Sequence, residues 1–324
     1  MSDEARFDRL AEALEAAFAD ARTAAADPEL AELIRIAHDL RSLPRPAFRA
    51  QLGADLMRRA AMTTTNAVNA TAVTPREGIR TVIPYLAVRP AVELIEFVKR
   101  AFGAQEHLRT TGGGGGVHAE VLIADSELMI GGGGAWAGTP MPTGLHLYVP
   151  DADRVYRDAL AAGAESLYAP VDQPYGDREA GVKDVAGNHW YIATHQTGGY
   201  VPPGLGAVTP FLHPRGAPGL IEFMKEAFAA EEVAMHRHPE GAIAHAQIRV
   251  GRSIIEMGEA HDEWGPMPTM FYVYVDDVDA WYRRALDAGA VSIEAPALQP
   301  YGHRRAAVRD AFDNEWYLAA PATG

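Results

Sequence analysis

The sequence Gln-Pro-Tyr-Gly-x-Arg occurs twice, at residues 173–178 and 299–304. A tyrosine in such a loop can stack on a planar ligand, and an arginine can bind a carboxylate or phosphate through two parallel hydrogen bonds. The structural alternative is that Pro-Tyr-Gly fixes a turn, while Arg178 pairs with Asp184 and Arg304 with Asp310 across adjacent strands. The sequence favours the structural role for both arginines and leaves both roles open for Tyr175 and Tyr301.

Two glycine runs, at residues 112–116 and 131–134, offer a different kind of chemistry. Neither run is followed by Gly-Lys-Ser/Thr at the start of a helix, so a phosphate-binding loop would lack its lysine, its hydroxyl and its helix dipole. We therefore expect both runs to be flexible loops at the mouth of a cavity.

Composition excludes several classes of function. The 324 residues include 43 acidic and 29 basic side chains, for a net charge of −14, which disfavours nucleic acid and anionic membranes as partners. The chain has no cysteine, so disulfides, thiolate nucleophiles and Cys-ligated zinc are excluded. The first residues are acidic and polar and do not resemble a signal peptide, so the sequence predicts a cytoplasmic protein.

An internal repeat organises most of the chain. At an offset of 126 residues, Ile95-Glu96-Phe97 recurs as Ile221-Glu222-Phe223, and Trp190-Tyr191 recurs as Trp316-Tyr317. Residues 79–198 and 206–320 are therefore two copies of one domain. Residues 1–62 carry apolar residues at helical spacing and are predicted to be a helical N-terminal segment, joined to the first copy by a linker at 63–78.

Each copy alternates between strand and helix patterns in a fixed order, which predicts an α+β fold of paired βαβββ modules. In the first copy the periodicity predicts helices at 91–102 and 151–162, and strands at 82–88, 117–123, 127–130, 145–149, 165–168, 181–185 and 189–194.

Several motifs together carry a family resemblance. They are Ile83-Pro84-Tyr85-Leu86, Ile95-Glu96-Phe97 with Ala101-Phe102-Gly103-Ala104, His118-Ala119-Glu120, Tyr148-Val149 leading to Asp151, Ala161-Ala162-Gly163-Ala164, and Gly176-Asp177-Arg178 before Asp184 and Trp190. With them the chain resembles the vicinal oxygen chelate superfamily of glyoxalase, bleomycin-resistance and extradiol dioxygenase proteins, and within it the PhnB-like branch. The resemblance implies two tandem glyoxalase-like domains, each with a curved mixed sheet around a ligand-sized cavity. It also implies that the fused copies form an intramolecular pseudo-dimer.

The same resemblance implies a divalent metal held by His, Gln or Glu at four positions. Only one carboxylate, Glu256, stands at any of these positions, so no cofactor is favoured. The eight positions are Ile83, Met129, Gly144 and Tyr191 in the first copy and Thr209, Glu256, Met270 and Tyr317 in the second.

Other residues are expected to face the cavities if the family's strand register holds. His146, His189 and Tyr191 are the candidate catalytic residues, with a histidine as general base and the tyrosine as oxyanion donor. The alternative metal site combines His118, His146 and His189 to hold zinc, iron, manganese or nickel. The candidate ligand-binding residues are Tyr85, His118, Tyr175, Arg178, Phe211, Tyr272, Tyr301, Arg304 and Tyr317.

Three functions remain open at this point. The first is a metal-independent protein that holds a small, partly aromatic molecule, for sequestration or resistance. The second is a lyase, isomerase or dioxygenase, either metal-free or with Glu120 or Glu315 as the base beside a metal. The third is a ligand-sensing protein whose N-terminal helices recruit a partner. Because the copies differ at cavity positions, we expect one functional pocket, in the first copy.

Overall fold

The computed structural model describes residues 81–112, 114–262 and 264–321, and the predicted N-terminal helices and linker lie outside these ranges. The described residues form two eight-stranded mixed sheets and four helices, as the predicted α+β fold requires. The first copy contains β1 (Val82–Val88), α4 (Ala91–Phe102), β2 (Gln105–Thr111), β3 (Val117–Ile123), β4 (Ser126–Gly132), β5 (Gly144–Tyr148), α5 (Ala152–Ala161), β6 (Glu165–Asp172), β7 (Asp177–Lys183) and β8 (His189–His195). The second contains β9 (Val208–Leu212), α6 (Ala217–Phe228), β10 (Glu231–Arg237), β11 (Ile243–Val250), β12 (Ser253–Met257), β13 (Met270–Tyr274), α7 (Val278–Asp287), β14 (Val291–Leu298), β15 (His303–Arg309) and β16 (Glu315–Pro321).

Local signals in the sequence set the helix ends. The side chain of Asp151 accepts a hydrogen bond from the Arg154 backbone N–H at 2.9 Å and so caps the start of α5. Asp277 caps α7 in the same way. At the end of α4, Gly103 adopts a left-handed conformation with φ of 69°, which glycine accommodates without strain. The predicted helices therefore begin and end within a residue of the observed ones.

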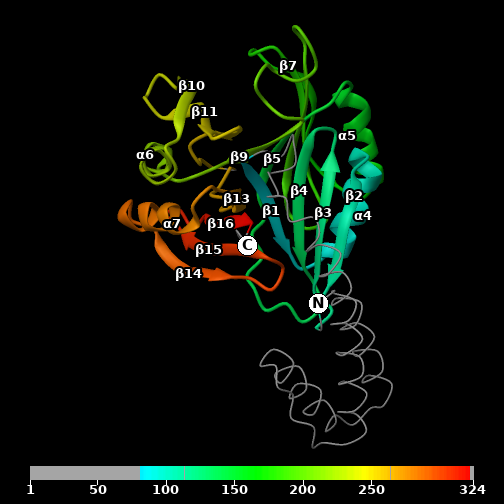
Figure 1. Cartoon of the computed structure of the whole chain (residues 1–324). Helices are drawn as coiled ribbons and strands as arrows, with labels where there is room; N and C mark the ends of the chain where they lie inside the picture. Colours follow the sequence, from blue (N-terminus) through cyan, green and yellow to red (C-terminus); the bar gives the residue numbers. More distant parts are fainter. Residues whose placement is uncertain (1–80, 113, 263, 322–324) are drawn as a thin grey trace, which may run out of the picture. The chain divides into compact units, whose positions relative to one another are not determined.

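The sheets combine strands from both copies (Figure 1). Sheet A has the order β14-β15-β16-β13-β1-β4-β3-β2, and sheet B the order β10-β11-β12-β9-β5-β8-β7-β6. The antiparallel pair β1–β13 joins the two modules of sheet A, and the pair β5–β9 joins those of sheet B. We expected the two modules of one copy to share a sheet; instead each module pairs with a module of the other copy. The repeated modules have equivalent edges, so periodicity does not specify which edge pairs with which.

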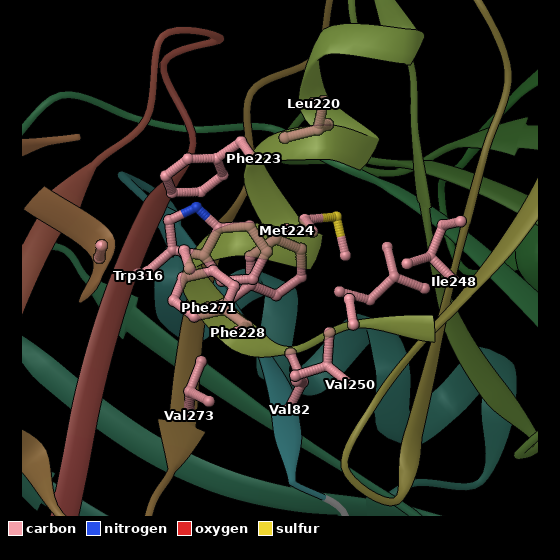
Figure 2. Packing of buried hydrophobic residues seen from close by; sticks show 14 of the residues in the cluster. Val82, Leu220, Phe223, Met224, Phe228, Ile248, Val250, Phe271, Val273 and Trp316 are labelled. Carbon is pink, nitrogen blue, oxygen red and sulfur yellow. The ribbon is translucent and has the colours of Figure 1, made fainter. Parts of the chain in front are cut away.

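The hydrophobic cores, in contrast, follow the copies. One cluster is built from the second copy plus Val82, and the other from the first copy plus Val208. In the first of these clusters, Trp316 is fully buried and stacks on Phe271 with ring centroids 4.6 Å apart, beside Phe228 of α6 (Figure 2). Each copy thus has its own core, while the opposite sheet faces are shared between the copies.

The two copies make reciprocal contacts, as the halves of a symmetric dimer do. Ser253 Oγ accepts a hydrogen bond from the Val82 N–H at 2.8 Å, and Ser126 Oγ accepts one from the Val208 N–H at 3.0 Å. The hydroxyls of the equivalent residues Thr143 and Thr269, both fully buried, hydrogen-bond to each other. This arrangement is consistent with the expected intramolecular pseudo-dimer.

The Thr143→Val variant is expected to lower the free energy of unfolding by about 1 kcal/mol, because the buried Thr269 hydroxyl keeps only its 3.4 Å hydrogen bond to the Met267 carbonyl oxygen. The double variant Thr143→Val/Thr269→Val removes both hydroxyls and should cost less than the sum of the single variants. Urea denaturation of the wild type, Thr143→Val, Thr269→Val and the double variant measures this coupling. Additive losses of the free energy of unfolding would show that the two hydroxyls do not interact.

Candidate functional site

A cavity of about 580 Å³ lies against sheet B. On β5, Leu145 and Leu147 belong to the core cluster beneath the helices, so the alternation of a strand turns His146 toward the opposite side. Both copies contribute walls, so the cavity does not belong to the first copy alone. Its lining comprises His146, Tyr148, Tyr168, Tyr175, Asp177, Glu179, Tyr191, His195, Pro202, Phe211, His213, His236, His238, Ile243, Ala244, His245, Gln247, Glu256, Gly258, Glu259, His261 and Trp264.

A buried polar network crosses the cavity from one copy to the other. His146 Nε2 lies 3.0 Å from a Glu179 carboxylate oxygen, and its Nδ1 lies 3.0 Å from a Glu256 carboxylate oxygen. The second Glu256 oxygen is 3.1 Å from His245 Nε2 and accepts a hydrogen bond from the Gln247 side-chain amide. His146 is therefore held between two carboxylates that come from different copies.

The charges in this network stabilise one another. Burial alone would lower the pKa of His146, but the carboxylates of Glu256 and Glu179 raise that pKa to about 10. Burial alone would raise the pKa of Glu256, but His146 and His245 lower it to about 2. Because His146 keeps its proton at neutral pH, its ring has no free lone pair, and the general-base role expected from the sequence does not fit it.

Glu179 is a site residue that the sequence analysis missed. It is buried, and it accepts hydrogen bonds from Tyr168 Oη at 2.6 Å and from Tyr175 Oη at 3.2 Å. Burial would raise its pKa, but the hydrogen bonds and the charge of His146 lower it. The available signal was its position two residues after Asp177, which places both side chains on one face of β7.

Aromatic rings form the other wall of the cavity. The Tyr191 hydroxyl lies 2.7 Å from His213 Nε2, and Trp264 stacks on the His213 ring with centroids 5.9 Å apart. Phe211 contacts Tyr191 edge to face at 5.3 Å. Burial, followed by the charges of His189 and His261, lowers the pKa of His213 to about 4.

Two of the cavity histidines, His146 and His213, thus have pKa values shifted in opposite directions from that of an ordinary histidine. In a ¹⁵N NMR titration, the His213 ring should lose its proton near pH 4, whereas the His146 ring should keep its proton until about pH 10. A His213→Asn variant assigns the first signal. Titration of both rings near pH 6.5 would contradict the network.

Comparison with known proteins places this chain in a family. Residues 217–318 match the family model described as Glyoxalase/Bleomycin resistance protein/Dioxygenase superfamily. An uncharacterized protein of Mycobacterium bovis is 30% identical over 126 residues, which cover 36% of this chain and 83% of that protein. The chain belongs to the glyoxalase/bleomycin resistance protein/dioxygenase superfamily.

Other known proteins are similar to this chain in sequence or in fold. An uncharacterized protein of Mycobacterium tuberculosis is also 30% identical over 126 residues, which cover 36% of this chain and 74% of that protein. The crystal structure of glyoxalase I from Zea mays is similar with a TM-score of 0.58 at 11% identity, over 74% of this chain and 92% of that chain. At that identity the similarity concerns the fold alone.

The four metal positions of this superfamily do not fit a divalent cation in either sheet. Sheet B brings together Gly144, Tyr191, Thr209 and Glu256, of which only Glu256 is a carboxylate, and both its oxygens already accept hydrogen bonds. A side chain cannot replace Gly144, because its Cβ would clash with the Phe211 carbonyl oxygen. Sheet A brings together Ile83, Met129, Met270 and Tyr317. Within the described ranges, no group of three or more His, Asp or Glu residues is arranged to hold a metal ion.

The pairing of modules also places the three histidines of the alternative metal site on different sheets. His118 lies on β3 of sheet A, whereas His146 and His189 lie on strands of sheet B. His146 is fully engaged by carboxylates, while the buried Nδ1 of His189 has no hydrogen-bond partner. The predicted combination of His118, His146 and His189 is therefore wrong, since it assumed that the modules of one copy share a sheet.

The remaining predicted ligand-binding residues divide between the two sheets. Phe211 and Tyr175 line the sheet B cavity, as does Tyr191, the predicted oxyanion donor. On sheet A, the Tyr85 hydroxyl lies 3.1 Å from His118 Nδ1, and the Tyr272 hydroxyl lies 2.9 Å from His303 Nδ1. Tyr317 packs beneath the Arg305 guanidinium, and Tyr301 is about half exposed.

The two loop arginines form ion pairs with aspartates of the helices. Arg178 pairs with Asp153 of α5, and Arg304 pairs with Asp279 of α7 at 2.5 and 2.7 Å. The expected pairs with Asp184 and Asp310 do not form, because those carboxylates accept hydrogen bonds from the buried tryptophans.

No helix in the described ranges is long and apolar enough to cross a membrane.

Proposed function

We propose that the protein binds a small, partly aromatic molecule in the sheet B cavity without a metal ion. The observation that carries this proposal is the cavity itself, which combines an aromatic wall with a fixed network of polar groups. Its volume of about 580 Å³ lies within the range of roughly 300–1,000 Å³ that is typical of small-molecule sites. We infer a role in sequestration or resistance, as in the bleomycin-resistance type, on a PhnB-like version of the fold.

The aromatic wall supports a planar ligand. Trp264, Tyr191 and Phe211 present ring faces and edges at close spacing, and these can stack on an aromatic group. The polar groups beside them, Glu179 and His146, are already positioned by other side chains, so binding does not have to order them. Sequestration requires nothing more than such a preorganised pocket.

Equilibrium binding to a panel of aromatic metabolites and glycopeptide antibiotics tests the proposal. We expect Phe211→Ala to weaken the binding of any panel member at least about tenfold, through loss of apolar contact area. Phe211→Tyr keeps the ring and should retain binding. The absence of binding across the panel, or recovery of one equivalent of tightly bound metal from untagged protein, would contradict the proposal.

A further inference from the structure

The repeat provides an internal control for the charged residues of the cavity. Position 179 of β7 corresponds to position 305 of β15, so a glutamate in sheet B stands where sheet A has Arg305. Likewise Glu256 on β12 corresponds to Met129 on β4, in a part of the repeat where the offset is 127 residues, as it is between His118 and His245. The same strands therefore form with an arginine or a methionine at these positions. The fold does not require the two carboxylates, so their presence needs another explanation.

The cavity against sheet B has an excess of negative charge. Its lining includes four carboxylates, from Asp177, Glu179, Glu256 and Glu259, and no lysine or arginine is among the described residues that line it. Three lining histidines lie within hydrogen-bond distance of one of these carboxylates: His146, His195 and His245. Counted against these three paired histidines, the four carboxylates leave one negative charge in excess. Four further histidines also line the cavity: His213, His236, His238 and His261.

Part of this charge is fixed by the fold. Glu259 accepts hydrogen bonds from the backbone N–H groups of Gly216 and Ala217 at the start of α6, at 2.5 and 2.8 Å. Asp177 binds His195 at 2.6 Å. Glu179, in contrast, is held by the neutral hydroxyls of Tyr168 and Tyr175 as well as by His146. Glu179 is therefore the carboxylate best placed to meet a charged ligand.

The walls around these carboxylates suit the same ligand charge. Faces of tyrosine and tryptophan rings attract cations, and the cavity presents Tyr168, Tyr175, Tyr191 and Trp264. We propose that the ligand is an organic cation, with an ammonium or guanidinium group near Glu179 and an apolar, partly aromatic body against Trp264. This inference rests on the proposed binding function and adds the charge of the ligand.

Three probes of one shape and different charge test the inference by isothermal titration calorimetry at pH 7. They are 2-(1-naphthyl)ethylamine, 2-(1-naphthyl)ethanol and 1-naphthylacetate. At an effective dielectric constant of about 20, one unbalanced charge within roughly 12 Å of the ammonium favours the amine over the alcohol about tenfold. The carboxylate should bind more weakly than the alcohol.

Matched variants locate the charge that sets this preference. Glu179→Gln should reduce the ratio of amine to alcohol affinity several-fold while the alcohol still binds, which shows that the cavity is intact. Arg305→Gln, at the equivalent position of sheet A, should leave the ratio unchanged. Equal binding of amine and alcohol, or tighter binding of the acetate, would overturn the cation inference but keep the binding function. Failure of all three probes to bind wild-type protein would overturn both.

Discussion

The Glu256→Ala variant should lose about 3–5 kcal/mol of its free energy of unfolding, the usual cost of removing one partner from a buried ion pair. Glu256 is 1% exposed and sits at the junction of the network. Its carboxylate faces His146, His245 and Gln247 at 3.0–3.1 Å. Alanine leaves the buried His146 with one carboxylate and opens space beside it, so both the charge and the packing are disturbed.

Sheet A suggests the control for this experiment. There Tyr272 and Met129 occupy the positions of His146 and Glu256, so the same scaffold accepts a pair without opposite charges. The double variant His146→Tyr/Glu256→Met should therefore be more stable than Glu256→Met alone. Urea denaturation compares the variants, and a loss below about 1 kcal/mol for Glu256→Ala would show that the network contributes little to stability.

The stabilisation from His146 also depends on pH. Its pKa is raised in the folded protein from 6.5 to about 10, so its contribution is complete below pH 6.5 and is lost as the pH rises through 10. The pKa of Glu256 is lowered from 4.5 to about 2, so its contribution is present above pH 4.5 and is lost as the pH falls through 2. The difference in stability between wild type and Glu256→Ala should thus shrink as the pH rises from 6.5 to 10.

The sequence predicts the elements of this fold well where one face is apolar. The helix at 91–102 and the strand at 82–88 match α4 and β1, because their apolar residues recur with a clear period and end at Gly103 or before Pro90. Strand β2, residues 105–111, was missed. Its sequence Gln-Glu-His-Leu-Arg-Thr-Thr has no apolar alternation, since this edge strand is largely exposed on both faces.

The residues of the cavity were predicted only in part, because the sequence does not show which strands of the two copies pair. Strand parity predicted that His146, His189 and Tyr191 face a cavity; His146 and Tyr191 line the sheet B cavity, whereas His189 is not among its lining residues. Phe211 lines the same cavity. However, Phe211 belongs to the second copy, and nothing in the periodicity shows that β5 pairs with β9. Trp264 and His213 were missed because they lie outside the strands, where alternation gives no direction.

One structural motif was visible in the sequence but assigned to the wrong partner. Asp184 and Asp310 each precede a tryptophan by six residues, and each was expected to pair with an arginine. Asp184 instead accepts hydrogen bonds from the Trp190 indole N–H at 2.8 Å, from the Asn188 side-chain amide at 2.8 Å and from the backbone N–H groups of Ala186 and Asn188. Asp310 repeats these bonds with Phe312, Asn314 and Trp316.

Replacing either aspartate by alanine is therefore expected to lower the free energy of unfolding by about 3 kcal/mol. The buried indole and amide donors lose their acceptor, and each unsatisfied buried group costs roughly 1–3 kcal/mol. The losses for Asp184→Ala and Asp310→Ala should be similar, since the four hydrogen bonds agree within 0.1 Å between the copies. Asp→Asn keeps one acceptor oxygen and should lose less. Arg178→Ala, at the partly exposed pair with Asp153, should change stability least. Urea denaturation measures the free energy of unfolding of each variant. If Arg178→Ala lowered it as much as Asp184→Ala, the hydrogen bonds of Asp184 would not be the main contacts that hold the β7–β8 hairpin to the core.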